Sequence, residues 1–103
     1  MHISDGDKGA ITDWAQNCPE IAEVWLYGSR ARGNHGPGSD VDLAIVTVGE
    51  TLSERQECWM FAKWKNGPNL SQKVHLEWYD PDAEMKNVEL GVMRDGILLY
   101  RRL

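Results

Sequence analysis

The sequence lacks the long apolar run that a membrane-spanning helix requires. No stretch approaches the roughly 20 apolar residues of such a helix. The first residues, MHISDGDKGAITDW, also lack the basic-then-apolar order of a secretory signal. We therefore expect no membrane contact and predict a cytoplasmic protein. Only two cysteines, Cys18 and Cys58, occur in 103 residues and their spacing is not that of metal ligands, so we expect reduced thiols rather than a disulfide.

Basic residues are also few. Eleven lysines and arginines stand against 16 aspartates and glutamates, which gives a formal net charge of −5. Proteins that grip a nucleic-acid backbone usually carry a basic face, so we expect no direct nucleic-acid binding. A single nucleotide or a polypeptide partner remains compatible with this charge. The sequence contains no internal repeat, low-complexity tract or linker, and its length suits one modest core. We predict a single domain over residues 1–103.

Short helical and strand patterns alternate along the chain, which is typical of an α/β (α+β) domain. Strands are predicted over 21–27, 40–48, 72–80 and 97–102. Helices are predicted over 9–19, over 51–65 with Thr51 or Ser53 as its cap, and from about Pro81 to Gly96. The Gly-Ser pair after the first strand can begin a short helix, and the total is about four strands and three helices. We expect the five tryptophans to face the core: Trp14, Trp25, Trp59, Trp64 and Trp78.

Two aspartates, Asp40 and Asp42, stand at the start of the clearest predicted strand, DVDLAIVTV. Residues two apart in a strand project from the same face, so we expect the two carboxylates to converge while Val41 and Leu43 turn to the core. An unpaired buried charge is costly. Paired carboxylates suit Mg²⁺, which completes its shell with water and substrate phosphate. The alternative is a pair of solvated aspartates at a strand entry.

A Gly-Ser pair, Gly28 and Ser29, precedes this strand by ten residues, 30–39. A strand that ends here and passes into a helix leaves free backbone N–H groups at the positive end of that helix, which is an anion site. The Ser29 hydroxyl can add a donor to a phosphate oxygen. An ordinary turn is the alternative. A nucleoside triphosphate with Mg²⁺ needs both a phosphate cradle and a metal site, and the two motifs together offer both.

Over residues 24–48 the pattern GSRARG…SDVDLAIV resembles the signature of the minimal nucleotidyltransferases, a small branch of the DNA polymerase β-like nucleotidyltransferase superfamily. The resemblance implies the nucleotidyltransferase fold, a small mixed β-sheet flanked by helices. It implies that Gly28 and Ser29 hold a nucleoside triphosphate, with ATP favoured, and that Asp40 and Asp42 bind two catalytic Mg²⁺ ions. The implied reaction transfers a nucleoside monophosphate to an acceptor hydroxyl and releases pyrophosphate.

The third carboxylate of that family, which helps to activate the acceptor hydroxyl, has no direct counterpart. The corresponding strand reads KVHLEWYD and places His75 at that position, with Glu77 two residues further on and facing the same way. We favour Glu77 as the third catalytic carboxylate and metal ligand, because it keeps an all-oxygen site. The alternatives are His75 as base or ligand, an incomplete site, or two residues that only decorate the polar face of a sheet.

Two arginines flank the predicted anion site. Arg30, next to Ser29, is assigned to phosphate binding. Arg32 either contacts the triphosphate or a partner's acidic groups, or forms a strand-end ion pair, for example with Asp40. His35, in the glycine-rich segment between them and the aspartates, is interpreted as a loop residue.

The resemblance also suggests a partner. Minimal nucleotidyltransferases are often paired with a small helical HEPN protein as toxin and antitoxin, and the nucleotidyltransferase adds AMP to its partner and silences it. Because the chain carries no separate substrate domain, a HEPN-type partner or a homodimer would supply the acceptor surface. A small-molecule acceptor, such as an aminoglycoside, is another possibility. A hypothesis of a different class is a catalytically weak or inactive binding module that neutralises a partner by contact.

Overall fold

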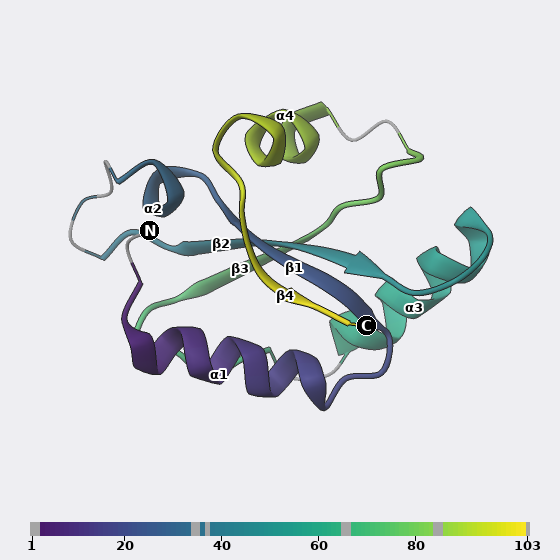
Figure 1. Cartoon of the computed structure of the whole chain (residues 1–103), viewed down its shortest axis with the longest axis horizontal. Coiled ribbons are helices and arrows are strands. Elements are labelled where there is room, and N and C mark those ends of the chain that lie inside the picture. Colours follow the sequence, from purple (N-terminus) through teal and green to yellow (C-terminus); the bar gives the residue numbers. More distant parts are fainter. Residues whose placement is uncertain (1–2, 34–35, 37, 65–66, 84–85, 103) are drawn as a thin grey trace.

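A single mixed sheet of four strands organises the molecule (Figure 1). The computed structural model describes residues 3–33, 36, 38–64, 67–83 and 86–102. The strand order is β3-β2-β1-β4. The central pair, β1 and β2, is antiparallel, β4 is antiparallel to β1, and β3 is parallel to β2. The strand bounds are β1 (Ile21–Tyr27), β2 (Val41–Thr47), β3 (Val74–Trp78) and β4 (Ile97–Arg101).

Helices lie on both faces of the sheet. In Figure 1, α1 runs below the sheet, α4 lies on the opposite side, and α3 follows the end of β2 that is remote from α2. The described residues form four helices rather than about three, because the single turn after Gly28 is a separate element. Their bounds are α1 (Asp5–Gln16), α2 (Ser29–Arg32), α3 (Leu52–Trp64) and α4 (Lys86–Asp95). The predicted α+β sheet flanked by helices is confirmed.

The hydrophobic core lies between one face of the sheet and the helices α1 and α3. Alternate residues of β1 and β2 point into it, and burying each large side chain contributes roughly 1.5–3 kcal/mol. The members of this core from these four elements are Ile11, Ala15, Ile21, Val24, Leu26, Val41, Leu43, Ile45 and Ala62. The residues between them, including Tyr27 and Asp42, consequently project from the other face, which α4 covers only in part.

Two helix starts follow from their caps. The first helix begins at Asp5, four residues before the predicted start, because the Ser4 hydroxyl oxygen accepts a hydrogen bond from the Asp7 backbone N–H at 3.0 Å. The predicted cap of α3 is confirmed at Thr51, whose hydroxyl oxygen accepts from the Glu54 N–H at 3.1 Å. Both cysteines are free, as expected. None of the helices that the structure describes is long and apolar enough to cross a membrane.

The predicted helix start near Pro81 is wrong. Residues 80–83 form a turn in which Asp80 accepts from the backbone N–H of Asp82 through its carboxylate, at 2.9 Å, and from that of Ala83 through its carbonyl, at 3.1 Å. Asp80 is fully buried, and the Arg55 Nε donates to its carboxylate at 2.6 Å. This side-chain turn competes with helix formation over residues 81–83, and the first described residue of α4 is Lys86.

The expectation for Trp64 is also wrong. Its side chain is 85% exposed at the end of α3, whereas the other four tryptophans are half-buried. In this part of α3 the side chain that faces the core is that of Ala62, which is 1% exposed. His35, Lys65 and Asn66, which bear on the predicted loop and helix end, lie outside the described residues.

Candidate active site

The Gly-Ser turn and the paired aspartates meet in space. Gly28 ends β1 with φ 77° and ψ −154°, a conformation that is essentially restricted to glycine. A Cβ atom built on Gly28 would stand 2.7 Å from the Oδ2 of Asp42. The Asp42 carboxylate therefore lies directly against the backbone of the turn, and the two motifs that the sequence separates by ten residues form one site.

The helix after the turn is only four residues long. It begins at Ser29 and ends at Arg32, with the Gly33 N–H donating to the Ser29 carbonyl at 2.8 Å. Because the helix dipole grows with the number of aligned peptides, α2 adds little positive potential. Any anion binding here rests mainly on the backbone N–H groups of the turn and on the Ser29 hydroxyl.

Both aspartates belong to the open face of the sheet. Asp42 is opposite Tyr27 on β1 and opposite His75 on β3, and Asp40 immediately precedes β2. Val41 and Leu43 are fully buried on the core side, as predicted. Strand alternation then turns both carboxylates to the same side.

Charge is concentrated around Asp42. Burial raises the pKa of this carboxyl above its ordinary value, and the negative charges of Asp40 and Glu77 act in the same direction. The electrostatic interactions of Asp42 with His75 and Arg32 act in the opposite direction and lower the pKa. A divalent cation between the aspartates would relieve the repulsion, so the donor set of two hard carboxylates fits Mg²⁺ completed by water and phosphate oxygens.

His75 and Glu77 contact each other. The His75 Nε2 lies 2.6 Å from the Glu77 Oε1, and the two side chains are 51% and 43% exposed. In the register of the parallel strands, His75 pairs with Asp42. Glu77 pairs with Ala44, which is two residues further along β2 from the glycine turn. Among the residues that the structure describes, no three histidine, cysteine, aspartate or glutamate side chains are arranged to enclose a metal ion. The three-carboxylate set of Asp40, Asp42 and Glu77 thus stays a prediction.

Arg30 holds the chain that leads into the aspartates. Its side chain is largely buried, at 8% exposure. Its Nε and Nη2 both donate to the Ser39 carbonyl, at 3.1 and 2.9 Å. Ser39 directly precedes Asp40, so this fork fixes the entry to β2. Sequence reasoning missed this role, and the assignment of Arg30 to phosphate stays a prediction.

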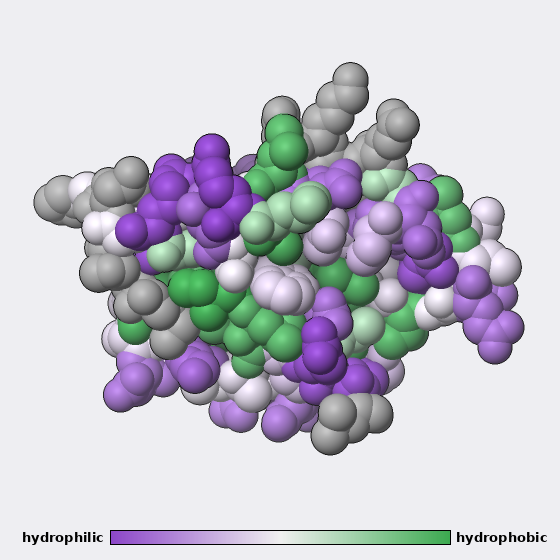
Figure 2. All heavy atoms as spheres, turned by 45° about the horizontal axis from the view of Figure 1, so that its top comes forward, coloured by the Kyte–Doolittle hydropathy of each residue, from purple (hydrophilic) through white to green (hydrophobic). Residues whose placement is uncertain are grey.

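Arg32 joins the site to α4. Its Nη1 donates to the Asp95 Oδ2 at 3.2 Å. Arg32 thus forms an ion pair with the last residue of α4, instead of the predicted strand-end pair with a residue such as Asp40. Asp95 also accepts from the Nε of Arg94 at 2.8 Å. Hydrophilic residues gather at the end of this face where α2 lies, seen from the side of α4 in Figure 2.

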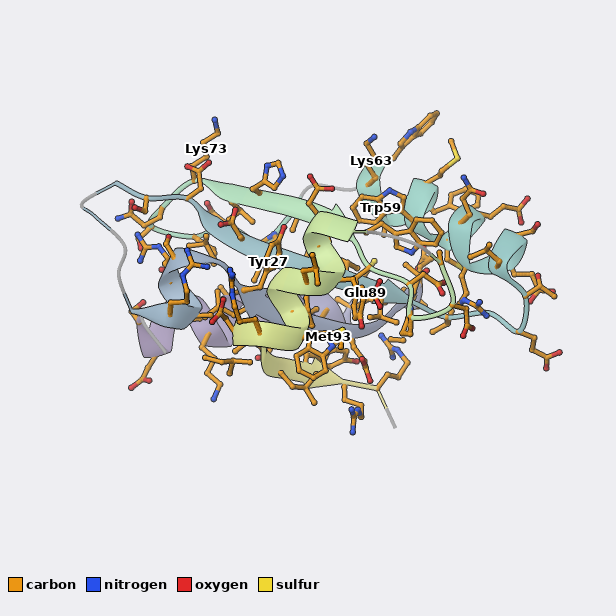
Figure 3. All side chains as sticks on the ribbon, turned by 90° about the horizontal axis from the view of Figure 1, so that it is seen from above. Tyr27, Trp59, Lys63, Lys73, Glu89 and Met93 are labelled. Atoms are coloured by element: carbon orange, nitrogen blue, oxygen red, sulfur yellow. The ribbon has the colours of Figure 1, made fainter. Side chains whose placement is uncertain are left out.

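Sequence reasoning also missed Tyr27. Burial, together with the charges of Asp42 and Glu77, raises the pKa of Tyr27 to about 12, so its hydroxyl stays protonated near neutral pH and can donate a hydrogen bond. Figure 3 shows Tyr27 beside α4, where a Cβ on Gly91 would stand 2.9 Å from the ring. The sequence contains a clue to this placement. Tyr27 directly precedes Gly28, and because strand residues alternate between faces, it projects from the face opposite to that of the buried Leu26.

In this arrangement the backbone of the glycine turn could hold a phosphate ester, and the strand-borne aspartates beside it could hold a divalent cation. The family described as "Polymerase beta, Nucleotidyltransferase" matches residues 10–102, and the chain belongs to this family. No curated protein gives a significant match to the sequence.

Two solved structures share the fold. One is described as a toxin–antitoxin crystal structure with AMP-PNP; it is 19% identical, with a TM-score of 0.62, and the match covers 93% of this chain and 74% of that one. The other is described as a double aspartate-to-glutamate mutant of the toxin–antitoxin MntA-HpeT; it is 17% identical, with a TM-score of 0.60, and the match covers 92% and 73% of the two chains. At these identities the likeness establishes a common fold.

Proposed function

We propose that the protein is a Mg²⁺-dependent nucleotidyltransferase that moves AMP from ATP to a hydroxyl group on a partner protein, in the cytoplasm. The observation that carries the proposal is the contact between the Asp42 carboxylate and the backbone of Gly28. It brings a candidate phosphate cradle and a candidate metal ligand within one contact distance. Membership of the polymerase β nucleotidyltransferase family supports the reaction class.

The residues divide the work as follows. Gly28 and Ser29 bind and orient the triphosphate through backbone N–H groups and the hydroxyl, with Arg30 as a further proposed contact. Asp40 and Asp42 hold the metal, which when bound supplies charge stabilisation at the phosphate oxygens. The protein contributes mainly positioning and electrostatics, as is usual for phosphoryl-type transfer.

Glu77 is our favoured base. The acceptor oxygen forms a bond to the α-phosphorus, the bond from that phosphorus to the pyrophosphate oxygen breaks, and Glu77 takes the proton of the acceptor hydroxyl. His75 is the alternative base, and its contact with the Glu77 carboxylate allows it to orient that carboxylate or to receive the proton from it. For Glu77 to become a third metal ligand, its carboxylate must turn from His75 toward Asp42.

A protein acceptor is supported by the shared fold of two toxin–antitoxin structures, one described with the ATP analogue AMP-PNP. The mutant in the second structure replaces two aspartates that are two residues apart, the spacing of Asp40 and Asp42. We therefore propose an antitoxin whose partner is a HEPN-type toxin. A small-molecule acceptor is the alternative within the same reaction class.

The test is label transfer. Purified protein is incubated with Mg²⁺ and ATP labelled at the α-phosphate, in lysate of its own host, beside the Asp42→Asn variant. A labelled protein band that Asp42→Asn loses supports the proposal, and mass spectrometry of the band identifies the acceptor. Pyrophosphate release without a labelled protein points to a small molecule.

A second candidate function is neutralisation of a partner by contact alone. The mutual contact of His75 and Glu77 favours it, because the described part of the site contains no complete three-ligand set. Asp42→Asn separates the two hypotheses, since partner neutralisation would persist in this variant if contact suffices. Absence of transfer and of pyrophosphate release with all common nucleotides would reject the enzymatic proposal.

A further inference from the structure

The hydroxyl of Tyr27 has no hydrogen-bond partner among the residues that the structure describes. The side chain is half-buried, and a polar group that is withdrawn from water usually has a partner, because leaving it unpaired costs free energy. A phenol keeps its proton at neutral pH. The Tyr27 hydroxyl is therefore a hydrogen-bond donor that is available to a ligand of the candidate site.

The sheet register places Tyr27 inside this site. Tyr27 is directly opposite Asp42 in the antiparallel pair of β1 and β2, and directly opposite residues have Cβ atoms about 4.5–5.5 Å apart on the same face. On the other side of β2 lies β3, which carries Glu77. The charges of Asp42 and Glu77 both act on the Tyr27 hydroxyl, so the hydroxyl is within electrostatic reach of the proposed metal ligand and of the proposed base.

The helix α4 holds the Tyr27 ring in place. A Cβ atom built on Gly91 would stand 2.9 Å from the Cδ2 and 3.6 Å from the Cε2 of the ring. The glycine therefore allows the backbone of α4 to lie against the ring, beside which the helix runs (Figure 3). A ring that is restricted by backbone contact presents its hydroxyl in a fixed place, and a donor that is fixed in advance is effective in catalysis.

We propose that the Tyr27 hydroxyl donates a hydrogen bond to a non-bridging oxygen of the α-phosphate of the bound nucleotide. This inference rests on the proposed function. The candidate phosphate cradle, Gly28 and Ser29, directly follows Tyr27 in the chain, whereas the proposed base Glu77 belongs to β3. A hydroxyl between these two sides is placed where the acceptor oxygen meets the α-phosphorus.

The donor would act on charge that develops during transfer. As the acceptor oxygen bonds to the α-phosphorus and the pyrophosphate oxygen leaves, negative charge builds on the equatorial oxygens of the phosphoryl group. A hydrogen bond to one of these oxygens strengthens as the charge grows. The tyrosine keeps its own proton throughout, and the proton of the acceptor hydroxyl goes to Glu77.

Two other roles of Tyr27 predict different results. If the ring only packs against Gly91, phenylalanine replaces tyrosine without loss of activity. If the hydroxyl instead orients the Glu77 carboxylate, phenylalanine lowers the rate, but the loss does not depend on the atoms of the α-phosphate.

The first measurement compares the full chain with Tyr27→Phe and Tyr79→Phe. Initial rates of label transfer are recorded in host lysate with Mg²⁺ and ATP labelled at the α-phosphate. Tyr27→Phe keeps the ring against Gly91 and should lower kcat about 100-fold, with little change in the KM for ATP, because the donor acts mainly in the transition state. Tyr79 is a second half-buried tyrosine, just beyond the end of β3, and Tyr79→Phe should leave both constants unchanged.

The second measurement identifies the atom that accepts the hydrogen bond. In each of the two diastereomers of ATPαS a different non-bridging oxygen of the α-phosphate is replaced by sulfur, which is a weaker acceptor. In the wild type, the diastereomer with sulfur at the oxygen facing Tyr27 should react more slowly than ATP. In Tyr27→Phe the slowing caused by this diastereomer should shrink, because the hydrogen bond is already lost. The slowing caused by the other diastereomer should be the same in both proteins.

Thermal melts confirm that both phenylalanine variants are folded. An active wild type with an equally active Tyr27→Phe overturns the inference and leaves the proposed function standing. A lower kcat in Tyr27→Phe with unchanged sulfur effects for both diastereomers also overturns it, and assigns the hydroxyl to Glu77. A wild type that neither transfers label nor releases pyrophosphate overturns the proposed function itself, and the inference with it.

Discussion

At the scale of single residues, Gly28 is subject to two separate constraints. Its positive φ disfavours any side chain, and the Asp42 carboxylate occupies the space that a Cβ would need. Gly38 has the same φ of 77°, but no atom of the described residues outside its immediate chain neighbours lies within 4 Å of its Cβ position. The chain thus offers a control that separates backbone strain from displacement of the carboxylate.

We expect Gly28→Ala and Gly38→Ala each to lower the unfolding free energy by about 1–2 kcal/mol, because alanine disfavours the positive φ at both positions. Each kcal/mol corresponds to a fall in Tm of roughly 4–8 °C. Only Gly28→Ala should also lose nucleotide transfer by a factor of about 100 or more, because it moves Asp42 out of position. Thermal melts and initial rates of pyrophosphate release measure the two effects. Equal rates in the two variants would show that the contact between Gly28 and Asp42 has no role in transfer.

The contact between His75 and Glu77 permits a second test with matched substitutions. Glu77→Gln removes the proposed base and should lower the transfer rate by a factor of about 100 to 10,000. His75→Gln leaves the carboxylate in place and should lower it much less. Initial rates at saturating ATP and Mg²⁺ decide between them, and a larger loss in His75→Gln would assign the base to the imidazole.

At the scale of elements, α4 is the helix that lies against the site face. It approaches β1 closely at Gly91, where an added Cβ would stand 2.9 Å from the Tyr27 ring. Glycine inside a helix ordinarily costs 0.5–1 kcal/mol relative to alanine, so its presence here is explained by the close approach. In α1, by contrast, the part of the chain that the structure describes brings no atom outside the local helix backbone within 4 Å of the Cβ position of Gly9.

We expect the same substitution to have opposite effects in these two helices. Gly9→Ala should raise the unfolding free energy by about 0.5–1 kcal/mol through helix propensity. Gly91→Ala should lower it, because α4 or the Tyr27 ring must shift. Urea denaturation measures both, and the double variant Gly91→Ala/Tyr27→Leu should recover part of the loss. A stabilising Gly91→Ala would mean that α4 is loosely packed on Tyr27.

At the scale of the whole molecule, the sequence predicts the central strand well and the contacts between elements poorly. The bounds of β1 are predicted to the residue, because an apolar, β-branched run is enclosed by Pro19 and the Gly-Ser turn. The aspartate pair and the turn are likewise local motifs. Their contact depends on the tertiary structure. The sequence suggests it only because a nucleoside triphosphate with Mg²⁺ needs both motifs in one site.

The missed residues depend on packing between distant segments. The contact of Arg30 with the Ser39 carbonyl exists only in the folded chain, so the residue type and its position beside Ser29 do not reveal it. Trp64 is an apolar residue at helical spacing, and its exposure follows from the orientation of α3 rather than from its own type. Asp80 replaces a predicted helix start by a turn because Arg55, 25 residues away, reaches its carboxylate.

Asp95, the last residue of α4, forms an ion pair with Arg32 of α2, and this pair makes the stability of the protein depend on pH. The hydrogen bond from Arg94, followed by that from Arg32, lowers the pKa of this carboxyl below its ordinary value, although burial acts in the other direction. The folded state therefore binds the proton more weakly than the unfolded state, whose pKa is about 3.9. The stabilisation is complete above that unfolded pKa and is lost as the pH falls through the lower, folded pKa.

Asp95→Asn should accordingly lower the unfolding free energy at pH 7 and have progressively less effect below about pH 4. Urea denaturation of both proteins from pH 7 to pH 3 measures the difference. Asp82→Asn, at a side chain that is 76% exposed beside Arg55, serves as the control and should have little effect across this range. A difference between wild type and Asp95→Asn that is independent of pH would mean that the ionised carboxylate does not join α2 to α4, and that the residue acts through packing alone.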